Sequence, residues 1–114
     1  MFDVEIKNLK ISANIGITAD ERKKKQLLKV TLNFSYSVPK GKDLEAMNNL
    51  KDYSKITKTL KQFITESSYD TLEKLIISSS QMLTKKFKIK KVKVKINKTA
   101  VAKRYGSETV SVSN

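Results

Sequence analysis

The sequence predicts an α+β domain, in which a four-stranded antiparallel sheet is covered on one face by two helices. Three observations lead to this prediction. Four segments alternate between apolar and polar residues, which is the period of a strand with one buried face. Two segments between them carry apolar residues at helical spacing. The 114 residues contain no internal repeat or linker, so we expect one domain over residues 1–114, with element order ββααββ.

The first two strands are predicted to form an antiparallel hairpin. Residues 3–15 alternate with a change of parity near Lys7 and Asn8, which indicates a β-bulge. Residues 28–38 alternate without error, and Pro39 ends the pattern. The stretch between the two strands is read as a charged loop that follows Gly16, where a glycine gives the backbone freedom in φ.

Two helices should follow a connection over residues 40–51 that contains a short helical turn. The first is capped by Asp52 and ends near Ser67, and the second is opened by Asp70 and ends near Lys86. Their apolar stripes predict which sides are buried. The stripes are Tyr53, Ile56, Leu60, Phe63 and Ile64, and Leu72, Leu75, Ile76, Ser79, Met82 and Leu83.

The last two strands are expected at residues 92–96 and, after a loop, at Thr109–Val112. With the helices on the apolar face, the other face must stay hydrated. The long second strand and the terminal strands should leave sheet edges, which closure of several sheets into a barrel would remove. The hydrated face is predicted to carry Lys29, Thr31, Asn33, Lys91, Lys93 and Lys95.

The composition excludes several classes of site. Without Cys or His, the chain has no thiolate zinc site and no triad built on His, and we expect no metal site. No apolar run is long enough to cross a bilayer, and the N-terminal segment lacks the features of a signal peptide. These features predict a soluble cytoplasmic protein with no membrane partner.

The formal charge of +13 raises the alternative of a non-catalytic basic protein that binds nucleic acid. The cations are nearly all Lys, they are spread along the chain, and Arg occurs only at Arg22 and Arg104. No aromatic and basic signature for base stacking accompanies them. We therefore expect nucleic-acid binding to be the less favoured function.

Four side chains outside the regular pattern are candidates for chemistry, and each has a structural alternative. Glu21, beside a run of cations, could simply belong to a solvated connector. Tyr53, on an apolar helical stripe, is typical of a core residue with its hydroxyl turned outward. Glu73, three residues after Asp70, could complete a capping box. Lys98 follows the parity of the apolar face, so it either marks the end of the strand or projects into a pocket.

Four stretches in order resemble the signatures of the dihydroneopterin aldolase family. The first is Gly16 followed by Glu21-Arg22 and Gln26, and the second is Asp52-Tyr53. The third is Thr71-Leu72-Glu73, and the fourth is Asn97-Lys98, where Thr99 replaces the usual proline. The resemblance covers nearly the whole chain. It implies the tunnelling fold, in which several subunits close a β-barrel with helices outside and the lysine-bearing face lines a tunnel.

The resemblance also implies a pterin substrate, site roles and a homo-oligomer, tetramer or octamer, with active sites between subunits. Glu73 would anchor the pterin with help from the backbone at Leu72. Glu21 would hold side-chain hydroxyls or a water, Lys98 would transfer protons, and Tyr53 would act from an adjacent subunit. The implied reaction is the cleavage of 7,8-dihydroneopterin in folate biosynthesis, which needs no cofactor. A homologous epimerase of dihydroneopterin triphosphate would use much the same residues and is the alternative.

Overall fold

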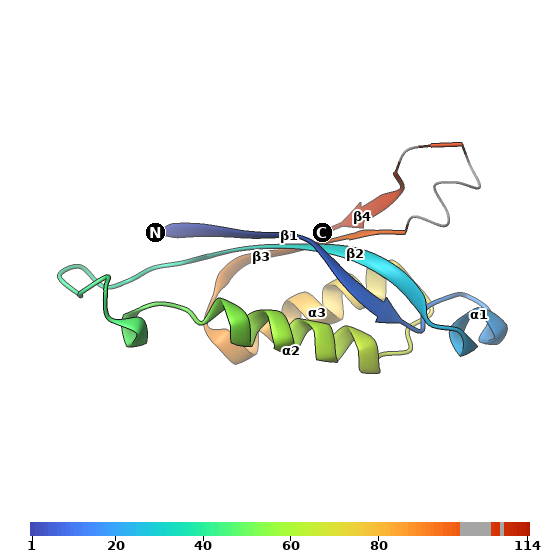
Figure 1. The fold of residues 1–114 in the computed structure, drawn as a ribbon, viewed down its shortest axis with the longest axis horizontal. Coiled ribbons are helices and arrows are strands. Elements are labelled where there is room, and N and C mark those ends of the chain that lie inside the picture. Colours follow the sequence, from blue (N-terminus) through green and yellow to red (C-terminus); the bar gives the residue numbers. More distant parts are fainter. Residues whose placement is uncertain (99–105, 108) are drawn as a thin grey trace.

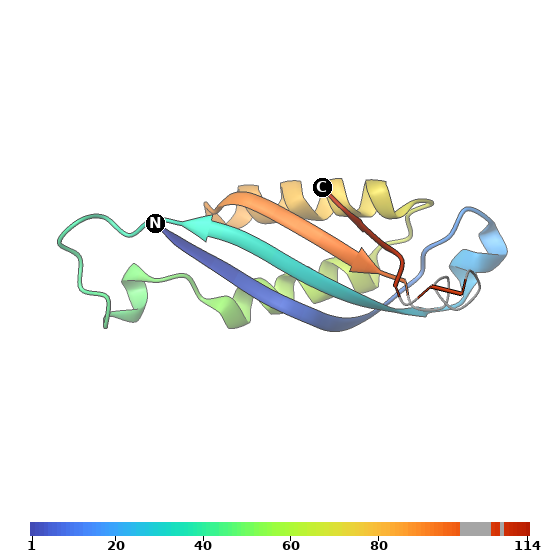
Figure 2. The same cartoon turned by 90° about the horizontal axis from the view of Figure 1, so that it is seen from above.

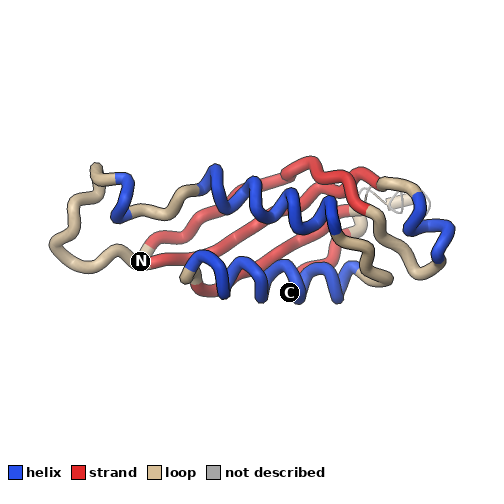
Figure 3. Tube along the Cα trace, turned by 90° about the horizontal axis from the view of Figure 1, so that it is seen from below, coloured by secondary structure: helices blue, strands red, loops and turns tan. Residues whose placement is uncertain are grey.

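Two long helices lie side by side across one face of a four-stranded antiparallel sheet (Figures 1 and 3). This computed structural model describes residues 1–98, 106–107 and 109–114. The α+β architecture agrees with the prediction. In chain order the elements are β1 (Phe2–Ala13), α1 (Ala19–Lys23), β2 (Gln26–Tyr36), the 3₁₀ helix η1 (Met47–Asn49), α2 (Tyr53–Glu66), α3 (Leu72–Phe87), β3 (Lys90–Asn97) and β4 (Ser111–Ser113).

Strands β1 and β2 form the predicted hairpin, and the predicted bulge is confirmed. Their register shifts between Ile6 and Leu9, and Asn8 adopts a φ of 57°. The backbone N–H of Asn8 donates to the hydroxyl of Thr31 at 3.1 Å instead of joining the ladder. Asparagine tolerates this left-handed conformation better than most residues, so the bulge falls where the sequence allows it.

The sheet order is β1-β2-β3-β4 (Figure 2). The long second strand is therefore an interior strand, and the expectation that it would leave an edge is wrong. β3 returns from the helices to pair with the free side of β2, and only β1 and β4 keep unpaired sides within the described sheet. Two edges remain to be covered, which is fewer than the sequence suggested.

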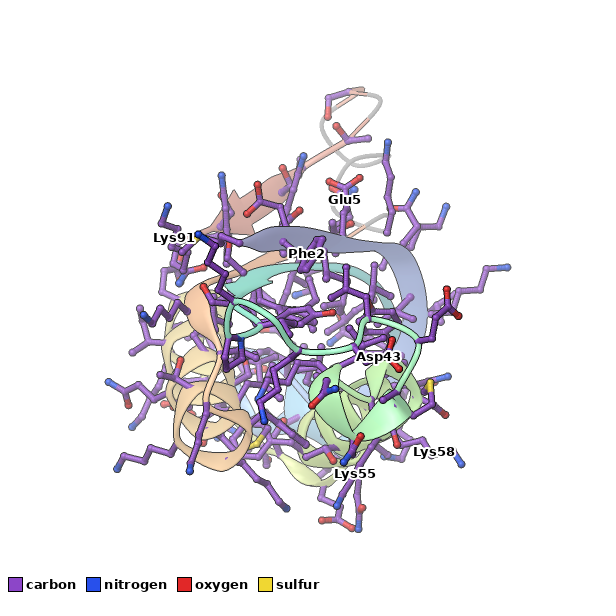
Figure 4. All side chains as sticks on the ribbon, turned by 90° about the vertical axis from the view of Figure 1, so that its left-hand side faces the viewer. Phe2, Glu5, Asp43, Lys55, Lys58 and Lys91 are labelled. Atoms are coloured by element: carbon purple, nitrogen blue, oxygen red, sulfur yellow. The ribbon has the colours of Figure 1, made fainter. Side chains whose placement is uncertain are left out.

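The two faces of the sheet differ as predicted. On the side away from the helices, Asn33 pairs with Lys93, and Thr31 with Lys95, although Thr31 itself is only 9% exposed and is not hydrated as predicted. Figure 4 shows Glu5 on this same side of the sheet. The alternation does not extend to Lys91, which has a φ of 52° beside a second register shift. Lys91 is thus displaced from the regular row of polar side chains.

The core lies between the other face of the sheet and the helices. Alternate side chains of β2 are buried there, which confirms the period of two. Helices α2 and α3 bury one stripe each, as their 3.6-residue spacing predicts. Side chains that are at most 2% exposed include Leu28, Val30, Leu32 and Phe34 of β2, Ile56, Leu60 and Ile64 of α2, and Leu75, Ile76 and Leu83 of α3.

The helix starts are partly as expected. The side chain of Asp52 caps α2 by accepting from the N–H of Lys55 at 3.0 Å, as predicted. Asp70 does not cap α3, because Thr71 does so by accepting from the N–H of Lys74 at 3.2 Å. Helix α3 therefore begins one residue later than predicted. None of the helices over the described residues has both the length and the apolar character needed to cross a membrane.

The charged stretch between β1 and β2 was predicted to be a loop, and this prediction is wrong. Residues Ala19–Lys23 form the short helix α1, which no buried residue anchors. A reciprocal capping box stabilises it instead: the N–H of Glu21 donates to the hydroxyl of Thr18 at 3.2 Å, and the N–H of Thr18 donates to the carboxylate of Glu21 at 3.4 Å.

Candidate functional site

A pocket lies where α1 and the start of α3 meet the end of β3. Three of the four stretches that resemble the family signatures contribute to it. The empty space in it is ≈ 480 Å³, which includes open solvent at the mouth of the pocket. Of the predicted site residues, the pocket brings together Glu21, Leu72, Glu73 and Lys98. The complete lining among the described residues is Ile15, Gly16, Ile17, Glu21, Asp70, Thr71, Leu72, Glu73 and Lys98.

The carboxylate of Glu73 is not engaged by the protein around it. Since Thr71 is the cap, Glu73 is the second residue of α3 and cannot form the capping box that its distance from Asp70 suggested. Among the described residues none forms a hydrogen bond or an ion pair with its carboxylate. A helix N-terminus favours an ionised carboxylate. Glu73 is therefore an exposed hydrogen-bond acceptor beside the pocket.

Two backbone donors accompany Glu73. The N–H groups of the first helical residues have no partner within the helix, and in α3 these belong to Leu72 and Glu73. The cap provided by Thr71 satisfies only the N–H of Lys74. The side chain of Leu72 packs against the core while its residue lines the pocket. The start of α3 thus offers both an acceptor and donors to a ligand.

Glu21 is held more tightly than Glu73. Its carboxylate accepts from both the N–H and the hydroxyl of Thr18, at 3.4 Å and 3.2 Å. The capping box that the sequence suggested for Glu73 is therefore formed by Glu21 instead. Because a carboxylate has about four lone-pair sites, this box leaves Glu21 able to accept from a ligand as well.

Gly16 matters because of space rather than because of its φ angle. It is buried and does not have a positive φ, so the expected need for conformational freedom is wrong at this position. A methyl group built on Gly16 would overlap the Cβ of Glu21 and come within 3.1 Å of its carboxylate oxygen. The absence of a side chain at Gly16 lets Glu21 lie against the backbone of the pocket.

Arg22 and Gln26, the other members of the first signature, brace the pocket wall. Arg22 donates to the carbonyls of Gly16 and Ile17 at 2.8 Å and 2.9 Å, and it forms an ion pair with Asp70 at 3.3 Å. The side chain of Gln26 donates to the carbonyl of Ile15 at 2.6 Å. The planar guanidinium suits such a clamp better than an ammonium would.

Lys98 directly follows β3 and is half-buried. Its backbone N–H donates to the carbonyl of Val110 at 3.1 Å, which ties the end of β3 to the chain before β4. Lys98 lines the pocket together with Leu72 and Glu73. Thr99, which replaces the family's usual proline, lies outside the described residues.

Tyr53 does not lie at this pocket. It begins α2 at the opposite end of the helix pair, where its side chain is 46% exposed. At roughly 1.5 Å per residue the 14 residues of α2 span about 20 Å, which separates Tyr53 from the start of α3. The hydroxyl of Tyr53 lies 3.1 Å from that of Tyr36. One chain therefore does not bring Tyr53 to Glu73 and Lys98.

Three relevant residues were not predicted to be site residues. Arg22 was noted as one of only two arginines among 24 basic residues and as part of the first signature, but it was given no role. Asp70 was expected to cap α3, whereas it pairs with Arg22 across the pocket wall. Tyr36 has no local signal, because its hydroxyl partner lies 17 residues away in another element.

The pocket combines three carboxylates, those of Glu21, Asp70 and Glu73, with the ammonium of Lys98. The described residues contain no cluster of three or more acidic side chains placed to hold a metal ion. Such a site can accept hydrogen bonds from ring N–H groups, and it can exchange protons through the lysine.

Solved structures show the same fold. A Vibrio cholerae protein assigned as a dihydroneopterin aldolase (FolB) superposes with a TM-score of 0.88 at 17% identity, covering 100% of this chain and 95% of that one. Escherichia coli dihydroneopterin aldolase in complex with neopterin gives a TM-score of 0.83 at 20% identity, covering 100% and 99%. These neighbours have the tunnelling fold.

Sequence comparison gives the family. Escherichia coli dihydroneopterin triphosphate 2'-epimerase is 29% identical over 72 residues, a match that covers 63% of this chain and 60% of the length of the epimerase. A family model described as FolB, dihydroneopterin aldolase, matches residues 4–113, which is nearly the whole chain. This chain belongs to the dihydroneopterin aldolase family.

Proposed function

We propose that this protein is a dihydroneopterin aldolase, which cleaves 7,8-dihydroneopterin into 6-hydroxymethyl-7,8-dihydropterin and glycolaldehyde. The observation that carries the proposal is the pocket at the start of α3, where Lys98 and Glu73, whose carboxylate is unengaged, line the same cavity. An acceptor for ring recognition and a group for proton transfer are the two things this reaction requires. Membership of the family supports the choice of a pterin.

Recognition of the pterin rests on the start of α3. A pterin presents an exocyclic amino group and a ring N–H side by side, and one carboxylate can accept from both as a bidentate pair. Glu73 fills this role because no described side chain competes for its oxygens. The N–H groups of the first turn, including that of Leu72, are available to oxygen atoms of the ligand.

The cleavage is a retro-aldol reaction that needs no cofactor. The side-chain carbon–carbon bond breaks as the neighbouring hydroxyl loses its proton and becomes the carbonyl of glycolaldehyde. The electron pair moves into the imine of the dihydropterin ring, which gives an enamine intermediate. Protonation of the exocyclic carbon then restores the imine and yields the hydroxymethyl product. The substrate therefore supplies its own electron sink.

Each remaining site residue has a defined task in this scheme. Lys98 moves protons near the imine nitrogen and the departing hydroxyl. Glu21 holds the side-chain hydroxyls or a water, using the acceptor capacity that its capping box leaves. Tyr53 of a second copy of the chain gives a proton to the enamine. A positioned acid or base typically contributes roughly a hundredfold to ten-thousandfold in rate.

The position of Tyr53 supports a site shared between two copies of the chain. Tyr53 and the pocket lie at opposite ends of one molecule, so only another copy can supply the tyrosine. Apolar side chains near Tyr53 are exposed and suit burial against a partner, namely Phe2, Leu44 and Met47. A tetramer or octamer closed into a barrel would also cover β1 and β4, and it would place the polar sheet face in a tunnel.

The second candidate is a dihydroneopterin triphosphate epimerase, which the 29% identity to the Escherichia coli enzyme favours. The described pocket offers little to a triphosphate: Arg22 is paired with Asp70, and Lys98 lines the cavity together with two further carboxylates. We therefore expect the unphosphorylated substrate to react faster.

The direct test supplies purified protein with 7,8-dihydroneopterin and with its triphosphate in parallel. Release of glycolaldehyde from the first compound supports the aldolase. Inversion of the triphosphate without cleavage of either compound would instead assign the epimerase. Binding of nucleic acid with a steep salt dependence and no turnover of either pterin would contradict both.

The roles of Lys98 and Glu73 can be separated by substitution. Lys98→Ala should lower kcat by roughly a hundredfold or more while pterin binding is kept. Glu73→Ala should weaken pterin binding by roughly tenfold to a hundredfold, because a charge-assisted pair is lost. Steady-state kinetics and equilibrium titration with neopterin measure the two effects. Lys61→Ala and Glu66→Ala, exposed on α2, are matched controls. Equal kinetic effects of the first two variants would contradict separate roles.

A further inference from the structure

The hydroxyl of Tyr53 has a partner that the proposed reaction does not use. It lies 3.1 Å from the hydroxyl of Tyr36, and either oxygen could donate by distance alone. The two tyrosines differ sharply in exposure: the side chain of Tyr36 is 3% exposed, and that of Tyr53 is 46% exposed. A buried phenol thus meets a surface phenol at the end of the molecule opposite the pocket.

Tyr36 is held rigidly. It is the last residue of β2 and pairs directly with Phe2 of β1. Its ring lies 5.8 Å from that of Phe2 and 6.4 Å from that of Phe34, both in tilted arrangements. A ring fixed by the strand on one side and by neighbouring aromatic side chains on the other presents its hydroxyl in one direction.

The direction of the hydrogen bond follows from the surroundings of the two hydroxyls: the buried Tyr36 finds no other acceptor among the described residues for its hydrogen, whereas the exposed hydroxyl of Tyr53 can give its hydrogen to water or to a ligand. The hydrogen bond with Tyr53, together with burial, raises the pKa of the Tyr36 hydroxyl, while the backbone at Lys51 acts in the opposite sense. The higher pKa agrees with this arrangement, in which Tyr36 donates and the oxygen of Tyr53 accepts.

This direction leaves the hydrogen of Tyr53 available. A phenol has one hydrogen, and if Tyr53 were the donor it would spend that hydrogen on Tyr36. As the acceptor, Tyr53 can direct its hydrogen toward a ligand outside its own chain. The bond also restricts rotation of an exposed side chain that would otherwise sample several rotamers.

We propose that Tyr36 is a positioning residue for Tyr53, holding its ring and leaving its hydroxyl hydrogen free to protonate the intermediate in a neighbouring subunit. The proposal rests on the proposed aldolase function. It assigns Tyr36 no contact with the substrate, because Tyr36 acts only through the oxygen of Tyr53. Two consequences separate this role from a structural one: the proton-transfer step slows, and the effect vanishes when Tyr53 has no hydroxyl.

The experiment compares Tyr36→Phe, Tyr53→Phe and the double variant with the unmodified protein, using 7,8-dihydroneopterin as substrate. Tyr36→Phe keeps the ring and deletes only the hydroxyl. We expect kcat to fall by roughly tenfold, the effect of one lost hydrogen bond, while KM stays within about twofold because Glu73 is unchanged. The solvent deuterium isotope effect on kcat should increase, because proton transfer from Tyr53 becomes more rate-limiting.

The double variant is the decisive comparison. If Tyr36 acts through Tyr53, the double variant turns over as fast as Tyr53→Phe alone, so the two losses are not additive. Thr59→Val, which deletes a hydroxyl bonded only within α2, is the matched control and should retain the kcat of the unmodified protein.

Several outcomes would overturn the proposal. Additive losses, or an isotope effect that Tyr36→Phe leaves unchanged, would show that the hydroxyl of Tyr36 contributes to stability alone. If the unmodified protein cleaves dihydroneopterin and the Tyr36→Phe variant has the same kcat, this inference is overturned and the aldolase function still stands. An unmodified protein without turnover would overturn the aldolase function and this inference together.

Discussion

The two ends of the molecule contribute different chemistry. The pocket end is charged: Glu73 and Lys98 face a cavity whose wall is braced by the ion pair between Arg22 and Asp70. The tyrosine end carries two phenols, Tyr36 and Tyr53, among apolar side chains. The first end can hold and ionise a polar ring, and the second can donate a proton without adding charge. Neither end alone contains the complete set that the proposed reaction requires.

The contrast explains how one small fold can build a demanding site. Helices α2 and α3 run in opposite directions, so the start of each lies at a different end (Figure 1). Both starts are useful positions, because the first turn of a helix offers unpaired N–H groups and favours negative charge. In the oligomer that we propose, joining the ends of two molecules would combine these features across one seam. The interface would then serve the chemistry in addition to covering apolar surface.

The largest expected effect comes from inactivating the two ends in separate variants and then mixing these variants. Lys98→Ala and Tyr53→Phe should each lose roughly a hundredfold or more in kcat. Hybrid oligomers formed by refolding the two variants together should regain activity at about a quarter of the sites, since some pockets keep Lys98 and meet an intact Tyr53. The measurement is glycolaldehyde release before and after mixing.

A double variant provides the control for this experiment. Mixing Lys98→Ala with the chain that carries both substitutions leaves no site with an intact Lys98, so no activity should return. If the Lys98→Ala and Tyr53→Phe mixture stays as inactive as this control although hybrids form, the two ends do not share a site.

An intermediate effect is expected from disturbing only the pocket end. Gly16→Ala places a methyl group on the Cβ of Glu21, so the backbone or α1 must shift. Overpacking of this kind typically costs about 1–3 kcal/mol in stability. Denaturant unfolding should show this loss, and KM should rise because the wall of the pocket moves.

Gly41→Ala is the matched control for Gly16→Ala. Gly41 has open space around it but a φ of 86°, so alanine strains the backbone without touching the pocket. Stability should fall by about 1 kcal/mol while KM stays the same. An unchanged KM in Gly16→Ala would mean that the close approach of Gly16 and Glu21 does not shape the site.

Most of the architecture could be predicted from the sequence, because burial on one face imposes a period that a sequence displays directly. The alternation of residues 28–38 located β2, and the parity change beside Asn8 located the bulge. The helix that follows Asp52 begins as its capping chemistry suggests. What could not be predicted was the position of β2 inside the sheet, since pairing between distant strands leaves no local pattern.

The candidate site was predicted less completely. The family resemblance pointed to Glu73 and Lys98, which do line one pocket, whereas their roles stay predictions. A capping box was suggested for Glu73, whereas Glu21 forms one with Thr18. Asp70 and Thr71 are adjacent and both can cap, so a shift of one residue moved Glu73 out of a capping box. Helix α1 was missed because it buries no side chain, and a charged stretch without apolar periodicity is typical of a loop.

The smallest expected effect concerns the tyrosine end and its response to alkaline pH. In the folded protein the pKa of Tyr36 lies above its ordinary value of 10.0, first because of the hydrogen bond with Tyr53 and then because of burial. Above pH 10 the unfolded chain therefore releases this proton while the folded chain still holds it. Linkage then requires the free energy of unfolding to fall as pH rises. The stabilisation from Tyr36 is complete below its pKa in the unfolded chain and is lost as pH rises through its pKa in the folded protein.

Tyr36→Phe should remove this dependence. Urea unfolding at pH 8 and at pH 11 should show a larger loss of unfolding free energy in the unmodified protein than in Tyr36→Phe, after the titration common to both is subtracted. Tyr53→Phe should reduce the dependence in part, because it removes the hydrogen bond and the charge interaction with Tyr53 and leaves burial. Parallel losses in all three proteins would mean that the two hydroxyls do not interact in solution. The tyrosine end would then lack the ordered donor that distinguishes it from the pocket end.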